Sequence, residues 1–428
     1  MSIKSRELIL GAAVVVVATV AVMGVGVRFS PSQAFFRDNP KEVVDEVWQI
    51  INYQYVDGTF NQTDWREVRT EYLGRSYANK SEAYGAVREM LEKLGDPYTR
   101  FMDPEEFQNM QIDTAGELTG VGIQITKDEE TNKLIVIAPI EESPAFTAGI
   151  LAQDILTKID GKSTDGMEIN DAVNLIRGKP GTVVTLTIQR GEKEIDYPLT
   201  RAKIEIHPVK ARLEETPNEK IGYIRLNQFS AQSSQEMEEA MRKFEEEGVA
   251  GYVLDLRSNP GGLMYSSVEI ARMWIDQGTI VSTVDRVGRG EVHQANHRAL
   301  TDKPLVVLVD GGSASASEIL SGALQDHERG VLVGTKTFGK GLVQSVRGLG
   351  DGSGLAVTIS KYLTPDGRDI NKEGIEPDVV LELTDAQMKE LQGDRTKIGT
   401  KNDPQFALGL QVLNREIEQQ KGGAALAR

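Results

Sequence analysis

The chain has no cysteine among its 428 residues and only four histidines, at positions 207, 293, 297 and 327. The absence of cysteine excludes a thiol nucleophile, a disulfide framework and Cys-ligated zinc or iron–sulfur sites. It leaves the cellular compartment open, because a chain without cysteine is compatible with either redox environment. None of the histidines lies in a glycine-rich turn between a strand and a helix, so a Ser-His-Asp triad has weak support.

Clusters of basic residues are also missing. The 48 lysines and arginines are outnumbered by 64 acidic residues, which gives a net charge of −16 without any long basic run. Because binding to a phosphate backbone needs clustered Lys and Arg, we expect no nucleic-acid partner. No constellation of metal ligands is visible, and Thr119–Ile123 lacks the third spaced glycine and the following helix of a dinucleotide fingerprint. We therefore expect neither a metal nor a cofactor.

One long hydrophobic run is present, at the N-terminus. Lys4 and Arg6 precede an uncharged apolar stretch over residues 8–27, which Arg28 follows. Twenty residues at about 1.5 Å each span roughly 30 Å, the thickness of a bilayer core. The two basic residues are expected to stay cytoplasmic, so the rest of the chain is exported. Residues 32–34 also fit a small-x-small cleavage site, so residues 1–34 are either a cleaved signal peptide or a membrane anchor, and the length favours the anchor.

The predicted secondary structure of the remaining chain changes twice. Residues 39–95 show helical periodicity, and residues 113–200 combine short strands with two helices. From Ile221 onward strands and helices alternate, and Val249–Leu256 and Pro304–Asp310 are apolar throughout, as strands buried on both faces are. This layout predicts an α/β core. We place a signal peptide or anchor at 1–34, an N-terminal helical domain at 35–112, a β-rich domain at 113–200, the core at 201–385 and a helical tail at 386–428.

The segment Asp310–Glu318 is the first candidate for chemistry. It lies between a buried strand and an amphipathic helix, and its small residues let the backbone turn sharply and let a substrate approach. A serine there sits at a helix N-terminus, where free N–H groups and the helix dipole favour the negative charge of an oxyanion. The alternative is that these serines only cap the helix.

A serine nucleophile needs a base, and Lys340 is the candidate. Burial lowers the pKa of a lysine, so that its neutral amine can accept a proton. Lys340 is flanked by glycines, which allow the backbone to pack tightly around its stem and exclude water. If the segment is extended, Lys340, Leu342 and Gln344 face the same way, and the Gln344 amide is placed to orient the amine. The alternative is a solvated lysine in a glycine-rich turn.

A third glycine-rich turn, Asp255–Gly262, follows a buried strand and precedes a helix that contains Val268, Ile270 and Trp274. The two adjacent glycines at its end allow a backbone N–H to point at a reacting carbonyl. By itself this segment is only a turn.

These three segments, with the earlier Gly95–Phe101, together resemble the carboxyl-terminal processing peptidases, which are serine proteases with a Ser/Lys dyad. The Ser-Ala-Ser-Ala-Ser-Glu run, a lysine 25 positions after its middle serine in Thr-Phe-Gly-Lys-Gly, and the Asp-Leu-Arg-Ser-Asn-Pro-Gly-Gly turn stand in the family's order. The resemblance covers residues 39–385 and implies an α/β core like those of the Clp protease and crotonase folds.

The resemblance also implies a role for each matching residue. Ser315 is the expected nucleophile, Lys340 the general base, and Gln344 the residue that positions Lys340. The expected oxyanion hole consists of the backbone N–H groups of Gly262 and Ala316. Two neighbouring serines, Ser313 and Ser317, are then packing or capping residues. The dyad pattern is intact, which predicts an active enzyme.

Residues 113–200 resemble a PDZ domain. The residues that match its carboxylate-binding loop are Leu118, Thr119, Gly120, Val121, Gly122 and Ile123. A substrate tail is expected to add as a strand beside Gly122–Thr126 and against the helix that carries Val173, with an apolar C-terminal residue in the pocket. We also expect Arg177 to help couple occupancy of this domain to the protease core. The alternative for the loop is a tight turn without a ligand.

The sequence therefore predicts an endopeptidase exported to the periplasm or thylakoid lumen, which recognises apolar C-terminal tails and cleaves near them. Resemblance to photosynthetic members makes the precursor of a photosystem II reaction-centre subunit one candidate substrate. The PDZ domain either raises the local substrate concentration or gates access. The terminal helical segments are suited to pair with a second copy of the chain or to form a lid. A non-catalytic PDZ scaffold and a crotonase-type acyl-CoA enzyme are the alternatives; the intact dyad opposes the first and the export segment opposes the second.

Overall fold

The computed structural model describes residues 39–426 except 116, 129–130, 141 and 218. The chain forms two compact units. The first runs up to Phe107 and resumes with Val209–Phe229 and Ser233–Arg428, whereas the second comprises Gln108–Pro208 and Ser230–Gln232. The apolar run at 8–27 lies outside the described residues. Within the described part, no helix is both long and apolar enough to cross a bilayer.

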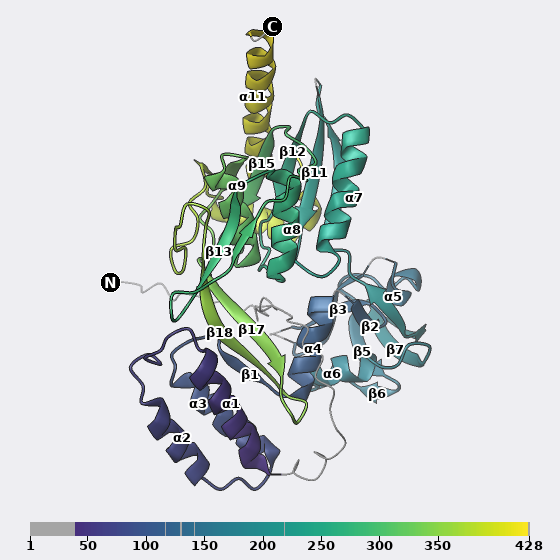
Figure 1. Cartoon of the computed structure of the whole chain (residues 1–428). Coiled ribbons are helices and arrows are strands. Elements are labelled where there is room, and N and C mark those ends of the chain that lie inside the picture. Colours follow the sequence, from purple (N-terminus) through teal and green to yellow (C-terminus); the bar gives the residue numbers. More distant parts are fainter. Residues whose placement is uncertain (1–38, 116, 129–130, 141, 218, 427–428) are drawn as a thin grey trace, which may run out of the picture. The chain divides into compact units, whose positions relative to one another are not determined.

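The first unit opens with three helices, α1 (Pro40–Gln54), α2 (Trp65–Gly74) and α3 (Lys80–Glu92). Asn39 caps α1, and its side chain accepts a hydrogen bond from the Lys41 N–H. The apolar faces of these helices share one buried cluster with Leu355 and Val357. These two residues belong to the strand β18 (Gly354–Leu363), so the helices pack directly on that strand (Figure 1).

A six-stranded sheet forms the centre of the first unit. Its order is β10-β11-β12-β15-β16-β19, and every neighbouring pair is parallel except β10 with β11. The strands are β10 (Val209–Glu215), β11 (Lys220–Leu226), β12 (Gly251–Asp255), β15 (Leu305–Val309), β16 (Val331–Gly334) and β19 (Val379–Val380).

Both faces of this sheet are covered, as the apolar strands predict. Val307 and Val309 lie in the cluster with α7 (Ser233–Glu246), α8 (Met264–Trp274) and α9 (Ala316–Asp326). Val306 and Leu308 lie in the cluster with α11 (Pro404–Leu426) on the other face. The alternation follows from the two-residue period of a strand. Before α11 come α10 (Asp385–Gly393) and a 3₁₀ turn (Arg395–Lys397).

A second, antiparallel sheet of the first unit has the order β1-β18-β13-β14, and β17 also pairs with β18. Its remaining strands are β1 (Arg100–Met102), β13 (Thr279–Asp285), β14 (Val292–Gln294) and β17 (Leu342–Gly348). The pairing of β1 with β18 holds the Gly95–Phe101 segment against the strand that also pairs with β17.

The second unit is the β-rich part of the chain. Its main sheet has the order β3-β4-β5-β7-β8, with β6 on β5, and a two-stranded sheet joins β2 to β9. Fourteen buried apolar residues, among them Leu134, Leu156 and Leu186, fill its core. The helix α4 (Pro104–Ala115) begins in the first unit and ends in the second. The other elements of the second unit are β2 (Glu117–Gly120), β3 (Ile123–Lys127), β4 (Leu134–Pro139), α5 (Pro144–Thr147), β5 (Ile155–Ile159), β6 (Lys162–Ser163), α6 (Ile169–Ile176), β7 (Val183–Arg190), β8 (Lys193–Thr200) and β9 (Ala202–Glu205).

A buried ion cluster attaches the C-terminal helix to the sheet. The Arg257 guanidinium donates to Asp255 at 2.7 Å and to Asp403, just before α11, at 2.7 Å. Both carboxylates are fully buried, and Arg257 also donates to the Gln405 side chain at 3.1 Å. The start of α11 is therefore fixed to the end of β12.

We expect Asp403→Ala to lower the free energy of unfolding by about 3 kcal/mol, because it leaves a buried guanidinium with one carboxylate fewer. Glu247→Ala is the matched control. Its partner Lys220 is about half exposed, as Glu247 is, so the change is expected to stay below about 1 kcal/mol. Urea denaturation of both variants measures the difference, and equal losses would contradict this account of the cluster.

Candidate active site

Ser315 lies at the junction between β15 and α9. It precedes the first residue of α9 and has φ +55° and ψ −111°. A positive φ is strained for a residue with a side chain and recurs at functional sites. The two neighbouring serines have ordinary partners: the Ser313 hydroxyl donates to Leu256 O and the Ser317 hydroxyl to Asn259 O, both at 2.9 Å. Ser315 differs from these two serines in its positive φ.

Two backbone N–H groups near Ser315 fit the predicted oxyanion hole. Ala316 is the first residue of α9, so its N–H has no acceptor within the helix. In the glycine turn, the Gly261 N–H donates to the Asn259 side chain at 2.9 Å. The N–H of Gly262 has no acceptor among the residues that the structure describes. This difference favours Gly262 over Gly261 as the second donor.

The glycine turn lies directly against the Ser315 segment. A Cβ at Gly261 would lie 2.7 Å from Ala314 O and 2.9 Å from both Ala316 N and Ser315 Cβ. A Cβ at Gly262 would lie 2.1 Å from Phe229 O. Both residues also have positive φ, +100° and +140°. Only glycine allows this approach of two backbone segments.

Lys340 lies in the loop between β16 and β17 and is 1% exposed. Its flanking glycines pack as the sequence predicts: a Cβ at Gly339 would lie 3.0 Å from Gly374 N, and one at Gly341 2.7 Å from Asn371 N. Burial, helped by the positive charge of Arg100, lowers the pKa of Lys340 to about 8, although Asp96 and Glu318 oppose the shift. The amine is thus poised to accept a proton near neutral pH.

A carboxylate to which the sequence analysis gave no role connects Ser315 to Lys340. Glu318 Oε2 accepts the Ser315 N–H at 2.8 Å and the Lys340 N–H at 2.9 Å. Its Oε1 accepts from the Thr337 hydroxyl at 2.6 Å and from the Gly339 N–H at 2.7 Å. Burial raises the pKa of Glu318, and these hydrogen bonds oppose the shift. The only sequence signal was its position three residues after Ser315, which is typical of a capping box.

Tyr362, on β18, is a second residue that the sequence analysis did not single out. Its hydroxyl is fully buried with the rest of the side chain and is shared between Ser315 O, at 3.0 Å, and Lys340 O. The two segments of the site are therefore joined by a carboxylate through their N–H groups and by a phenol through their carbonyls.

Gln344 lies on β17 and is fully buried. Neither atom of its side-chain amide has a hydrogen-bond partner among the described residues. The hydrogen bond to the Lys340 amine that the sequence predicts is therefore not formed in this structure. One reason is that β17 begins only at Leu342, so the strand alternation assumed for residues 340–344 does not extend to Lys340.

The second unit brings together the predicted peptide-binding residues. Leu118, Thr119 and Gly120 belong to β2, Ile123 begins β3, and the N–H groups of Val121 and Gly122 between them have no acceptor among the described residues. β3 is an edge strand, so it is open to an added strand. Val173, on α6, is partly buried, and α6 packs against β3.

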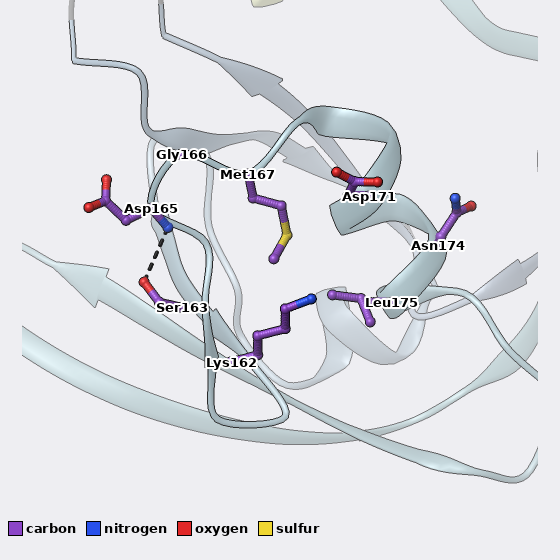
Figure 2. Close-up of a pocket in the computed structure, with 8 residues that line it drawn as sticks. All are labelled: Lys162, Ser163, Asp165, Gly166, Met167, Asp171, Asn174 and Leu175. Carbon is purple, nitrogen blue, oxygen red and sulfur yellow. Dashed lines mark hydrogen bonds between the residues drawn. The ribbon is translucent and has the colours of Figure 1, made fainter.

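A pocket on the second unit is separate from this groove. Figure 2 shows Lys162 and Met167 pointing into it from one side and Leu175 of α6 from the other, with Asp171 and Asn174 on the same helix. These helix residues lie on a different side of α6 from Val173. The pocket therefore has no part in the predicted peptide groove. No group of His, Asp and Glu in the described part of the chain is arranged to hold a metal ion.

Comparisons with known proteins find two domain families in this chain. A model of peptidase family S41 matches residues 220–381, and a PDZ domain model matches residues 135–190. A carboxyl-terminal-processing protease of Synechocystis sp. is 44% identical over 401 residues, which cover 93% of this chain and 90% of that protein. The chloroplastic carboxyl-terminal-processing peptidase 3 of Arabidopsis thaliana is 39% identical over 370 residues, covering 82% and 71%.

A solved structure, that of a photosystem II D1 C-terminal processing protease, matches 86% of this chain and 99% of its own. The TM-score is 0.57 and the identity 36%. The predicted α/β peptidase fold with a PDZ domain and helical terminal segments is thereby confirmed, as is a serine-type protease.

Gly261→Ala is expected to reduce kcat for peptide hydrolysis by about 100-fold or more. Its methyl group must displace the Ser315 turn or the oxyanion donors, and loss of one such donor alone has an effect of about this size. Gly74→Ala is the control, because a Cβ there meets no atom within 4 Å. A fully active Gly261→Ala protein would contradict the close approach seen here.

Lys340→Met is expected to stabilise the protein while abolishing hydrolysis. The pKa is lowered from its usual 10.5, so below pH 8 folding carries the cost of a buried ammonium. That cost is at most about 3 kcal/mol and shrinks between pH 8 and 10.5, where the unfolded chain binds more protons than the folded one. Chemical denaturation should show a larger gain at pH 7 than at pH 10. If Lys340→Met is less stable than the parent at pH 7, the buried Lys340 ammonium does not carry the cost inferred here.

Proposed function

Because this chain belongs to the carboxyl-terminal-processing protease family, we propose that it is an exported endopeptidase that cleaves proteins near their C-termini with a Ser315–Lys340 dyad. The observation that supports the dyad most strongly is the shared carboxylate: one Glu318 oxygen accepts the N–H groups of both residues. The two side chains therefore originate from backbone segments that are held together.

The reaction follows from these positions. The neutral Lys340 amine takes the proton of the Ser315 hydroxyl while Oγ bonds to the scissile carbonyl carbon. The N–H groups of Gly262 and Ala316 stabilise the oxyanion that forms. The Lys340 ammonium then gives its proton to the departing amine, and an acyl-enzyme remains. Water attacks this ester with Lys340 again as the base, which releases the new C-terminus and restores Ser315.

The base is only partly available at neutral pH. With a pKa of about 8, roughly a tenth of Lys340 is neutral at pH 7. Hydrolysis should therefore increase from pH 7 to 9. We assign Gln344 the role of positioning the amine once substrate is bound, because its unpartnered, buried amide is costly unless it gains a partner.

Substrate recognition is assigned to the PDZ domain. A tail adds as a strand to the open edge of β3, and its terminal carboxylate accepts the N–H groups of Val121 and Gly122. An apolar last residue packs against Val173. Leu118, Thr119, Gly120 and Ile123 hold the loop through β2 and β3.

Arg177 is assigned to coupling between tail binding and hydrolysis. It follows the last residue of α6, and its guanidinium donates to Asn109 on α4. The chain passes directly from β1 to α4, so this contact links the end of the peptide-binding helix to the helix that follows β1.

The relatives and the apolar run at residues 8–27 support the proposed compartment and substrate. The relatives include bacterial and chloroplastic processing proteases, which fits a location in the periplasm or the thylakoid lumen. Residues 8–27 would anchor the protein in the membrane if they are retained. The solved relative acts on photosystem II D1, and we propose its precursor as one substrate class for this chain. A homodimer formed through the helical ends is part of the same proposal.

The test uses protein that lacks residues 1–34 and a reporter protein whose tail ends in apolar residues. We expect cleavage near the tail by the parent, and a loss of at least about 1,000-fold in Ser315→Ala and Lys340→Ala. A reporter with an amidated C-terminus should raise KM, since the loop N–H groups then lose their carboxylate. Mass spectrometry locates the cut.

Equal cleavage by all three proteins would overturn the dyad. Binding of the tail without cleavage by the parent would instead revive the non-catalytic scaffold. Arg177→Ala is expected to keep tail affinity and thermal stability but to lower kcat, and an unchanged kcat would refute its coupling role.

A further inference from the structure

The Gly95–Phe101 segment belongs to the N-terminal part of the chain, yet it is fixed rigidly beside the candidate site. The Asp96 carboxylate accepts from the Tyr98 N–H at 2.9 Å, the Thr99 hydroxyl at 2.6 Å and the Thr358 hydroxyl at 2.7 Å. The Thr358 N–H in turn donates to the Thr99 hydroxyl at 3.0 Å. Thr358 lies on β18 and is the pairing partner of Gln344. The segment therefore has one defined position.

That position places an aromatic ring against the Lys340 amine. Lys340 Nζ lies 4.8 Å from the centre of the Tyr98 ring. In the described part of the chain, Nζ has neither a hydrogen-bond partner nor an ion-pair partner. A ring face attracts an ammonium group, and it also shields the amine from water. The ring face of Tyr98 can therefore contact the Lys340 amine in both its neutral and its protonated state.

The charges around the amine oppose one another. Arg100, on β1, favours the neutral amine, whereas the carboxylates of Asp96 and Glu318 favour the ammonium. The phenols of Tyr98 and Tyr362 have raised pKa values, mainly through burial, and so remain neutral near pH 7. Two of the three charged groups come from the Gly95–Phe101 segment.

We propose that this segment is a working part of the proton-transfer site: Tyr98 positions the Lys340 amine, and Arg100 and Asp96 together set the pH at which it becomes a base. The N-terminal helices would then have a catalytic purpose, because they hold the segment on β18. This inference rests on the proposed function, in which Lys340 is the general base.

The two charges give a test with opposite signs. Arg100→Gln removes the cation that disfavours the ammonium, so the rising limb of the pH profile of kcat/KM should move up by about half a pH unit or more. Asp96→Asn removes a charge that favours the ammonium, so the limb should move down by a similar amount. Lys93→Gln is the matched control, since that lysine pairs with Glu71 and is 37% exposed; its limb should not move.

Tyr98 is tested through kcat. Tyr98→Leu removes the ring face and should lower kcat about tenfold with little change in KM. Tyr98→Phe keeps the ring face and should recover most of that loss. Thermal denaturation of each variant shows whether it is folded, and the midpoint of a pH limb does not depend on the fraction of active protein.

The inference is overturned if Arg100→Gln and Asp96→Asn move the limb in the same direction, or if neither moves it. It is also overturned if Tyr98→Phe is as impaired as Tyr98→Leu. The dyad variants show whether the role of the segment or the proposed function has failed. If Ser315→Ala and Lys340→Ala are inactive but Arg100→Gln and Asp96→Asn leave the pH profile unchanged, only the role of the segment is refuted. If Ser315→Ala and Lys340→Ala are active, both the role of the segment and the proposed function are refuted.

Discussion

The candidate site depends on one buried carboxylate. Glu318 binds the N–H groups of Ser315 and Lys340 with the same oxygen, and no other residue described in the chain links the two through their N–H groups. Tyr362 adds a link through their carbonyls. Both links are hydrogen bonds to backbone atoms. They therefore fix the positions of the Ser315 and Lys340 backbones and do not involve the Ser315 hydroxyl or the Lys340 amine. The fold thus positions the two residues, and their side chains are proposed to carry out the reaction.

The same arrangement explains why the site is costly to build. Ser315 has a positive φ, and the Gln344 amide is buried without a hydrogen-bond partner among the described residues; both features are unfavourable. The burial of Lys340 is unfavourable for its ammonium form. They lie beside the sheet of β15 and β16, whose two faces are both packed against buried apolar residues. We expect these features to lower the stability of the fold, while burial lowers the pKa of Lys340 to about 8.

Much of this could be predicted from the sequence. Apolar runs predicted the buried strands, because this signal is local. The assignment of Ser315 and Lys340 as a dyad comes from the resemblance to a family pattern and stays a prediction. Glu318, Tyr362 and Tyr98 received no role, since their importance arises from contacts between segments far apart in the chain. For Gln344 the sequence predicted an extended segment, and the residue lies on β17. The predicted hydrogen bond to Lys340 is not formed, because it depends on where β17 begins, and periodicity does not determine that.

Titration of Lys340 itself shows most directly whether burial lowers the pKa of its amine far enough for it to serve as a base near neutral pH. In Ser315→Ala protein labelled with ¹³C at the lysine side chains, Lys340→Met identifies the Lys340 resonance by its disappearance. We expect a pKa of about 8 for this amine, well below the ordinary value of 10.5 for a lysine side chain. A Lys340 resonance that titrates near the ordinary 10.5 would show that the amine is an ammonium at every pH where the enzyme works, and would rule it out as the base.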